Sequence, residues 1–323
     1  MPRRPSDLDD HPSGGDTPPH RTPPHRDTAP DGDAHTAGVS RRGANDPGLD
    51  DLSAPRGADD PPEDWPADLA RPVGEESLVG GYIGRTTRAT LADGRTVVVK
   101  RCPYPALQEA DGLRALGVAG APVPAVFGVG AHILVLEYVA GDPDWSRLGR
   151  AVARLHRHTA ARFGWPIVNY HGRFPQDNTW SDSWPDFYVQ RRVAPQLARA
   201  DLPADLRARI ETACAGPLPA LLRPDPPASL THGDLWPGNM IDGRWLVDPA
   251  VSYADRELDL AYLSLSNDLP PEFMIAYRDE YPVEPDFEER RPALLLHKYL
   301  VNVRHFGDRA LPRLWTLLEH YGW

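Results

Sequence analysis

Residues 231–239 read Thr-His-Gly-Asp-Leu-Trp-Pro-Gly-Asn, and residues 247–249 read Val-Asp-Pro. A phosphotransferase needs a carboxylate to take the proton of the acceptor hydroxyl, an amide oxygen for Mg²⁺ a few residues later, and a second acidic group that bridges the metal to the phosphates. Asp234, Asn239 and Asp248 supply these groups in that order. The stretch therefore predicts a phosphotransferase catalytic loop, with Asp234 as the base and Asn239 and Asp248 as metal ligands.

The spacing around this stretch argues against an incidental turn. Gly, Asp, Pro and Asn are all common turn residues, so an ordinary loop is the alternative. However, four residues separate Asp234 from Asn239, which is the gap of the protein-kinase H-R-D-x-x-x-x-N loop. An ordinary loop also does not predict the short apolar strand 245–247 that ends in Asp248, where the kinase D-F-G motif would lie.

Composition divides the chain of 323 residues into a tail and a folded part. Residues 1–66 are rich in Pro, Asp, Gly, His and Arg, and Trp65 is their one aromatic residue, so we expect them to be disordered. A start at Val39 or Val73 is a further hypothesis for this tail, which the N-terminal mass of the native protein tests. The remainder is long enough for an α+β, two-lobed protein-kinase-like fold. We expect a β-rich nucleotide-binding lobe at 67–140 and a helical catalytic lobe at 141–323.

Charge and cysteine content exclude several classes of protein. The net charge is −11, so the phosphates of a nucleic acid would be repelled. The paired arginines at 3–4 and 41–42 are not followed by an apolar run, and no apolar stretch approaches the ~18 residues of a membrane span. We therefore expect a cytoplasmic protein with no membrane partner. Cys102 and Cys214 are too few for a disulfide framework, and we expect reduced thiols.

Two upstream features fit the nucleotide side of a kinase. Residues 96–100 read Thr-Val-Val-Val-Lys after the turn 92–94, which predicts the second strand of a hairpin that ends in Lys100. Lys100, one of only two lysines in the chain, is expected to contact the α- and β-phosphates. Gly80 and Gly81 allow backbone N–H groups to approach phosphates, although a plain hairpin turn is a serious alternative for these glycines.

A helix is expected to follow this hairpin, because Pro105 begins an apolar pattern that Gly117 ends. Its apolar face is expected to consist of Leu107, Ala110, Leu113 and Leu116. In a kinase-like lobe Glu109 on this helix would pair with Lys100 and hold it toward the nucleotide. A solvated glutamate is the alternative, and position alone does not decide between the two.

The apolar strand 132–139 is expected to lead into a hinge between the lobes. Backbone groups of Glu137, Tyr138 and Val139 would then bind adenine. Beyond this hinge, helices are expected at 148–160, 257–265, 271–281, 292–306 and 310–321. His156 and His158 on the first of them are expected to be structural or solvated.

The catalytic segment resembles the fructosamine kinase (ketosamine-3-kinase) family. Residues 232–239, 248–250 and 253–261 read H-G-D-L-W-P-G-N, D-P-A and Y-A-D-R-E-L-D-L-A, against the family's H-G-D-L-W-x-G-N, D-P-A and Y-G-D-R-E-x-D-L-A. Related antibiotic and choline phosphotransferases generally lack the Trp and the D-R-E-x-D-L-A run. The resemblance extends from about 75 to 307 and includes Asn169, Gly172, Pro175, Gln176, Asn178, Trp180, Trp184, Phe187 and Arg192.

The resemblance implies a kinase that uses ATP and Mg²⁺ to phosphorylate the sugar 3-hydroxyl of a ketosamine, which is an amine-linked ketose formed by glycation. Its acceptor is then a small or protein-linked ketosamine. Trp236 and His232, on either side of Asp234, are the expected substrate contacts, with packing of the Trp236 indole in the core as the alternative. Asp255 and Asp259 are expected to brace the loop, and Arg256 is within local reach as their partner.

Three positions depart from the family pattern, and they concern the acceptor more than the chemistry. Ala254 replaces the usual Gly, the stretch 264–269 lacks G-G-F, and Asn302 stands where the family tends to have His. The alternatives are therefore an aminoglycoside or another small hydroxylated amine as acceptor, or a catalytically silent nucleotide-binding module. The sequence does not separate ribulosamine from fructosamine, and it does not predict the oligomeric state.

Overall fold

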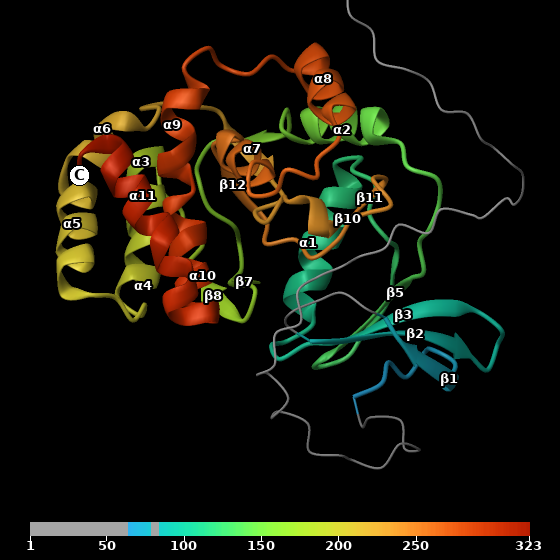
Figure 1. Cartoon of the computed structure of the whole chain (residues 1–323). Helices are drawn as coiled ribbons and strands as arrows, with labels where there is room; N and C mark the ends of the chain where they lie inside the picture. The colour runs from blue at the N-terminus through green and yellow to red at the C-terminus, as the bar shows by residue number, and fades with distance from the viewer. Residues whose placement is uncertain (1–63, 79–83) are drawn as a thin grey trace, which may run out of the picture. The chain divides into compact units, whose positions relative to one another are not determined.

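An antiparallel five-stranded sheet forms the N-terminal part of the folded chain (Figure 1). The computed structural model describes residues 64–78 and 84–323, which belong to one compact unit. The strands are β1 (Pro72–Ser77), β2 (Arg85–Leu91), β3 (Thr96–Arg101), β4 (Val126–Val129) and β5 (Ile133–Glu137), in the order β1-β2-β3-β5-β4. Since β2 and β3 pair antiparallel across the turn 92–94, the predicted hairpin is confirmed.

Helix α1 (Leu107–Val118) approaches the catalytic region closely. Its buried residues include Ala110, Leu113 and Leu116, as their spacing predicted. Leu107 is 54% exposed, so its predicted place on the apolar face is wrong, and the preceding Ala106 is buried instead. A Cβ on Gly112 would lie only 3.1 Å from the ring of Pro249, so α1 packs directly against the residue that follows Asp248.

The packed part of the chain begins before the expected end of the tail. Residues 1–63 lie outside the described residues, so the disorder expected for them stays a prediction. Trp65 belongs to the same expected tail, but it is only 6% exposed and joins the apolar cluster of Leu91 and Val135 in the sheet. Burial of this large indole explains why residues 64–66 join the fold despite their polar surroundings.

Helix α2 (Trp145–Leu155) opens the helical part of the chain (Figure 1). Its N-cap is Asp144, whose side chain accepts the backbone N–H of Arg147 at 3.0 Å. The expected helix 148–160 is too long at its C-terminal end, because Thr159–Ala160 forms the short strand β6. This strand pairs with β9 (Ala228–Thr231), which in turn pairs with β12 (Ser252–Ala254).

The remaining described elements also follow α2 in the sequence. They are β7 (Asn169–His171), β8 (Phe174–Gln176), α3 (Trp184–Asp186), the π-helix η1 (Phe187–Val193), α4 (Ala194–Leu197), α5 (Ala204–Ala215), α6 (Pro217–Leu221), the 3₁₀-helix η2 (Pro237–Asn239), β10 (Met240–Ile241), β11 (Trp245–Leu246), α7 (Glu257–Leu263), α8 (Pro271–Glu280), α9 (Phe287–Leu294), α10 (Leu296–Phe306), the 3₁₀-helix η3 (Gly307–Ala310) and α11 (Leu311–Tyr321). Helices α7, α8 and α11 agree with the expected helices apart from ordinary differences at helix ends.

The expected helix 292–306 is wrong at its N-terminal end, because two helices, α9 and α10, meet there. At the junction the N–H of Leu295 bonds to the carbonyl of Pro292 at 3.1 Å, which is the tighter i to i−3 pattern. The hairpin β7–β8 packs beside α10, since the rings of Phe174 and His305 lie 4.4 Å apart. This arrangement brings α10 to the edge of the catalytic loop.

Candidate active site

Two short paired strands bring the predicted metal ligands together. After β9 the chain runs through residues 232–236 into η2, and β10 and β11 then form a small antiparallel hairpin. The N–H of Val247 donates to the carbonyl of Asn239 at 3.1 Å. Asp248, the next residue in the chain, therefore lies close to Asn239. Asp248 has φ 58°, a left-handed conformation that non-Gly residues rarely adopt. This conformation marks Asp248 as a constrained, candidate functional residue.

Lys100 bridges two carboxylates from different elements. Its ammonium contacts Glu109 of α1 at 2.5 Å and also contacts Asp248. Burial alone would lower the pKa of Lys100, but Asp248 and Glu109 together hold it well above the ordinary value. Glu109 is only 4% exposed, so the alternative of a solvated glutamate is wrong. The hydroxyl of Tyr104 also donates to Glu109 at 3.2 Å.

Asp234 pairs with a lysine that the sequence analysis missed. The ammonium of Lys298, on α10, contacts Oδ1 of Asp234 and lies 2.7 Å from Nε2 of His171 on β7. Burial alone would raise the pKa of the Asp234 carboxyl, but Lys298 and then His171 hold it far below its ordinary value. The carboxylate therefore stays ionised. The one available signal was that Lys298 is the second of only two lysines in the chain.

The contact of Lys298 fixes the tautomer of His171. An ammonium group can only donate, so Nε2 of His171 must accept from Lys298 and the ring hydrogen lies on Nδ1. The 3.3 Å approach of the same Nε2 to Asp234 is then a close contact rather than an ion pair. Burial, and then Lys298, lower the pKa of His171, which agrees with a neutral ring. His171 thus positions the ammonium of Lys298 against Asp234.

The second ring in this cluster is His297, which precedes Lys298 on α10. Its ring lies edge-on to His171, with 5.2 Å between the centroids, and its Nδ1 is 2.7 Å from the hydroxyl of Tyr262. Burial and then His171 lower the pKa of His297 well below its ordinary value. The histidines around Lys298 are therefore neutral, and the positive charge beside Asp234 belongs to the lysine.

Asp259 braces the catalytic loop, as expected. Its carboxylate accepts the backbone N–H groups of His232 and Gly233, and it also contacts His156 at 3.2 Å. His232 is fully buried, with Nε2 at 3.0 Å from the carbonyl of Val247 and Nδ1 accepting the N–H of Asp234 at 3.3 Å. This geometry favours a structural role for His232, which connects the backbone at Val247 and Asp234. It does not favour the substrate contact expected of His232.

The partner expected for Asp255 is wrong. Asp255 contacts Arg223 at 3.3 Å rather than Arg256. Arg256 instead donates to the carbonyl of Pro282 at 2.6 Å and lies over the ring of Tyr281 at 3.6 Å. The prediction of an Asp255–Arg256 pair rested on their proximity in the sequence. It is wrong because the side chain of Arg256 packs on the segment that follows α8.

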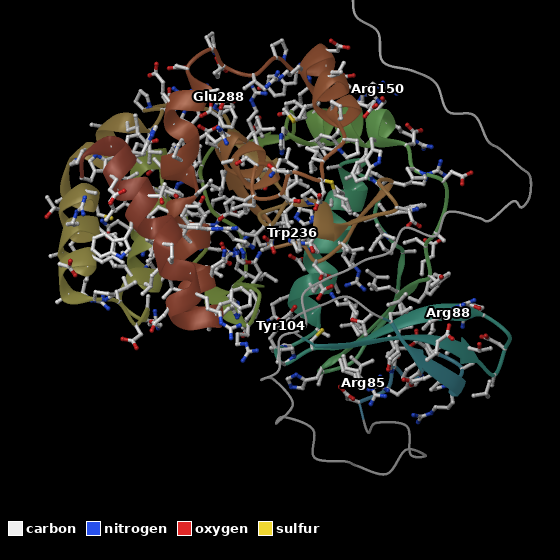
Figure 2. The ribbon with its side chains drawn as sticks, in the orientation of Figure 1. Arg85, Arg88, Tyr104, Arg150, Trp236 and Glu288 are labelled. Carbon is white, nitrogen blue, oxygen red and sulfur yellow. The ribbon has the colours of Figure 1, made fainter. Side chains whose placement is uncertain are left out.

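Trp236 is half-buried and packs over its own loop. A Cβ on Gly238 would lie 2.1 Å from the indole ring, so only glycine leaves room for it. Figure 2 labels Trp236 near the centre of the view. Trp236 is not among the described side chains that pack against the apolar core, and Gly238 is exposed, so this packing within the loop does not support the core alternative. A sugar contact through the remaining surface of the ring stays a prediction.

The predicted adenine and phosphate contacts have different outcomes. Gly80 and Gly81 lie outside the described residues. Glu137 ends β5, and its carboxylate accepts the backbone N–H of Ala125 at 3.2 Å. Tyr138 is 36% exposed, and the guanidinium carbon of Arg88 lies 4.7 Å from its ring centroid. The hinge role of Glu137, Tyr138 and Val139 stays a prediction.

Asn239 and Asp248 form an oxygen-rich pair that fits a magnesium ion. The Nδ2 of Asn239 donates to the backbone carbonyl of Asp234 at 2.9 Å, which orients the amide and leaves its oxygen for another partner. Carboxylate and amide oxygens suit Mg²⁺, which typically binds one or two carboxylates together with substrate phosphates. Within 64–78 and 84–323 no group of three or more His, Cys, Asp or Glu side chains could hold a metal alone.

Comparisons with known sequences agree with the catalytic motifs. A model of the fructosamine kinase family matches residues 72–321. A Thermus thermophilus protein described as a probable ketoamine kinase is 36% identical over 268 residues, covering 79% of this chain and 98% of the relative. An Escherichia coli K12 protein with the same description is 35% identical over 201 residues, covering 58% of this chain and 70% of the relative.

Comparisons with solved structures confirm the predicted α+β, kinase-like fold. A Thermobifida fusca protein described as a "putative fructosamine-3-kinase" superposes with a TM-score of 0.71 at 32% identity, covering 78% of this chain and 94% of that protein. The aminoglycoside phosphotransferase APH(4)-Ia gives a TM-score of 0.54 at 15% identity, covering 77% and 94%. At that identity the second likeness shows the fold alone. No described helix combines the length and apolar character needed to cross a bilayer.

Proposed function

Because the chain belongs to the fructosamine kinase family, and is therefore a kinase that phosphorylates a sugar hydroxyl, we propose that its acceptor is the 3-hydroxyl of a ketosamine. A kinase of this fold takes its phosphoryl group from ATP, and we propose Mg²⁺ as the metal. Phosphorylation of an amine-linked ketose would begin the repair of glycated amines, peptides or proteins. Both ribulosamines and fructosamines fit this proposal.

The observation that carries the chemistry is the double ion pair of Lys100 with Glu109 and Asp248. Catalysis of phosphoryl transfer consists largely of positioning and of charge stabilisation around the transferred group. Glu109 would hold the ammonium of Lys100 toward the α- and β-phosphates. Asn239 and Asp248 would hold the Mg²⁺ ion, which neutralises phosphate charge when it is bound.

Asp234 would accept the proton of the acceptor hydroxyl. As the bond between the acceptor oxygen and the γ-phosphorus forms, the bond from that phosphorus to the β-phosphate oxygen breaks, and ADP leaves. Since Lys298 keeps Asp234 ionised, its carboxylate orients the hydroxyl by accepting a hydrogen bond and takes the proton late in the reaction. Strong basicity is not required for that role, because the transition state of phosphoryl transfer is loose.

The contacts of Asp234 give no support to the aminoglycoside alternative. A polycationic acceptor would be favoured by acidic residues, whereas Lys298 and His171 are the groups that approach Asp234 from α10 and β7. The silent-module alternative is weakened because all of Asp234, Asn239, Asp248 and Lys100 lie in a connected arrangement.

The test is Mg²⁺- and ATP-dependent phosphorylation of a ribulose-lysine and a fructose-lysine derivative, with Asp234→Asn as the control. We expect transfer to at least one acceptor, and a loss of roughly 10²–10⁴-fold in turnover in the variant, as for removal of a general base. Transfer to neither acceptor, with ATP binding intact, would refute the ketosamine proposal. Wild-type turnover in Asp234→Asn would refute the role of Asp234.

A further inference from the structure

The two segments whose side chains His171 and Lys298 contact Asp234 lack acidic residues, although the protein as a whole is acidic. The chain has 46 acidic and 35 basic residues, yet 169–176 and 294–307 contain no Asp or Glu. Their titratable nitrogen-bearing side chains are His171, Arg173, His297, Lys298, Arg304 and His305. Such a segregation of charge creates a local field that favours an anionic ligand.

Side-chain contacts hold these two segments together along the length of α10. Near its start, Lys298 contacts His171 on β7 at 2.7 Å. Near its end, the ring of His305 lies 4.4 Å from the ring of Phe174 on β8. Lys298 and His305 are seven residues apart, so they lie on the same helical face, two turns or about 10 Å from each other. The surface that α10 shares with the β7–β8 hairpin thus extends from Asp234 to the C-terminal end of α10.

The arginines at the far end have no carboxylate partner in the described part of the chain. Arg304 donates to the amide oxygen of Gln196 at 2.5 Å, and its guanidinium stacks 3.6 Å over the ring of Phe174. Arg173 is exposed at the tip of the β7–β8 hairpin. Burial, followed by the positive charge of neighbours that include Arg173 and Arg304, lowers the pKa of His305 to about 4. These arginines therefore carry charge that nothing within 64–78 and 84–323 neutralises.

Lys298 connects this surface to the reacting hydroxyl. An ammonium group has three donors, and Asp234 and His171 take two of them. The third donor is available to an acceptor oxygen, since Lys298 is still 13% exposed. The charge of Lys298 is balanced by Asp234, so the excess positive charge is at the Arg173 and Arg304 end.

We propose that the acceptor carries an anionic group, a carboxylate or a phosphate, which binds at Arg173 and Arg304 while its sugar hydroxyl faces Asp234. This inference rests on the proposed function and narrows its substrate class. A ketosamine on the side-chain amine of lysine fits the spacing, because an extended lysine side chain separates its sugar from its α-carboxylate. A phosphate on the distal carbon of the sugar is the second source of the same chemistry.

The test compares kcat/KM for matched acceptors that differ in one anionic group. The first pair is an α-acetylated ketosamine-lysine with a free carboxylate and the same compound as its carboxamide. The second pair is a fructosamine with and without a terminal phosphate. Each pair is assayed with the wild-type protein, Arg173→Gln, Arg304→Gln and the matched control Arg150→Gln, since Arg150 is exposed on α2 (Figure 2).

We expect the wild-type protein to prefer the anionic member of one pair by about 3- to 10-fold, as for partly exposed charge pairs. This ratio should fall toward one in Arg173→Gln and Arg304→Gln, remain in Arg150→Gln, and decrease with added salt. The pair that shows the preference identifies the carboxylate or the phosphate as the source.

Turnover of ketosamines with ratios near one in both pairs would overturn the anionic subsite and leave the proposed function standing. A wild-type preference that Arg173→Gln and Arg304→Gln both retain would overturn its assignment to these residues. Failure to phosphorylate any of the four acceptors would overturn the proposed function, and this inference with it.

Discussion

The carboxylate of Asp259 accepts the backbone N–H groups of both His232 and Gly233, at 2.6 and 2.9 Å. These two residues immediately precede Asp234, so a side chain on α7 sets the path of the backbone that presents the candidate base. Gly233 has φ 82°, and a Cβ there would lie 1.9 Å from the carbonyl oxygen of Ala250. The loop can therefore take this path only with glycine next to Asp234.

Replacing this brace should damage both stability and catalysis. In Asp259→Asn one carboxylate oxygen becomes an NH₂ group, which faces a backbone donor instead of accepting from it. Since a hydrogen bond to a charged group contributes about 1.5–3 kcal/mol, we expect the free energy of unfolding to fall by about 2–4 kcal/mol and kcat to fall with it. Urea denaturation and initial rates measure the two effects. Asp201→Asn, at an exposed position, is the matched control, and equal results for the two variants would contradict the brace.

Lys100 should contribute to catalysis and to the balance of buried charge at the same time. Lys100→Met removes the cation proposed to contact the phosphates, and we expect kcat/KM for ATP to fall by about 10²–10³-fold. It also leaves Glu109 buried without its partner, so unfolding should require less denaturant than in the wild-type protein.

A double-variant cycle separates these two contributions of Lys100. Adding Glu109→Gln to Lys100→Met removes the uncompensated charge, so we expect stability to recover while activity stays low. A double variant as unstable as Lys100→Met would show that the charge of Glu109 is not the cause.

The residue pairs that the sequence analysis expected to lie close together, and that the structure brings together, are also close in the sequence. Asn239 lies near Asp248 because two adjacent strands pair, and Glu109 meets Lys100 because one turn separates their strand and helix. Lys298 is different, since it contacts Asp234 although the two residues are 64 positions apart. A short sequence pattern cannot predict a contact over that separation. The error for Arg256 is the opposite one. Arg256 is adjacent to Asp255 in the sequence and was expected to pair with it, but its side chain packs on Tyr281 instead.

Removing Lys298 should change the pH dependence of the reaction. Without its ammonium, burial raises the pKa of Asp234, so in Lys298→Met the acid limb of kcat/KM should move to higher pH. The depressed pKa also stabilises the wild-type fold above the ordinary aspartate pKa, and this contribution is lost as pH falls. A pH–rate profile measures the shift, and Lys298→Arg should restore the wild-type profile in part. An unchanged acid limb in Lys298→Met would contradict the electrostatic role.

Asp255 should make the stability of the protein fall as pH rises from about 3.8 to about 7. Burial, and then the nearby Glu257, raise the pKa of Asp255 from 3.8 to about 7, and the 3.3 Å contact with Arg223 does not offset these effects. Between those two values the folded state binds a proton that the unfolded state has released. The resulting stabilisation is complete below 3.8 and is lost as pH rises through about 7.

Asp255→Asn should remove this pH dependence, because the amide does not titrate and its oxygen can still accept the N–H of Glu257. Relative to the wild-type protein, we expect the variant to gain thermal stability on going from a pH below the raised pKa of Asp255 to one above it. Calorimetric Tm values on both sides of that pKa measure the gain, with Asp201→Asn as the control for loss of one carboxylate. If the Tm difference between Asp255→Asn and wild type is the same on both sides, Asp255 is ionised in the folded protein throughout and Arg223 compensates its burial.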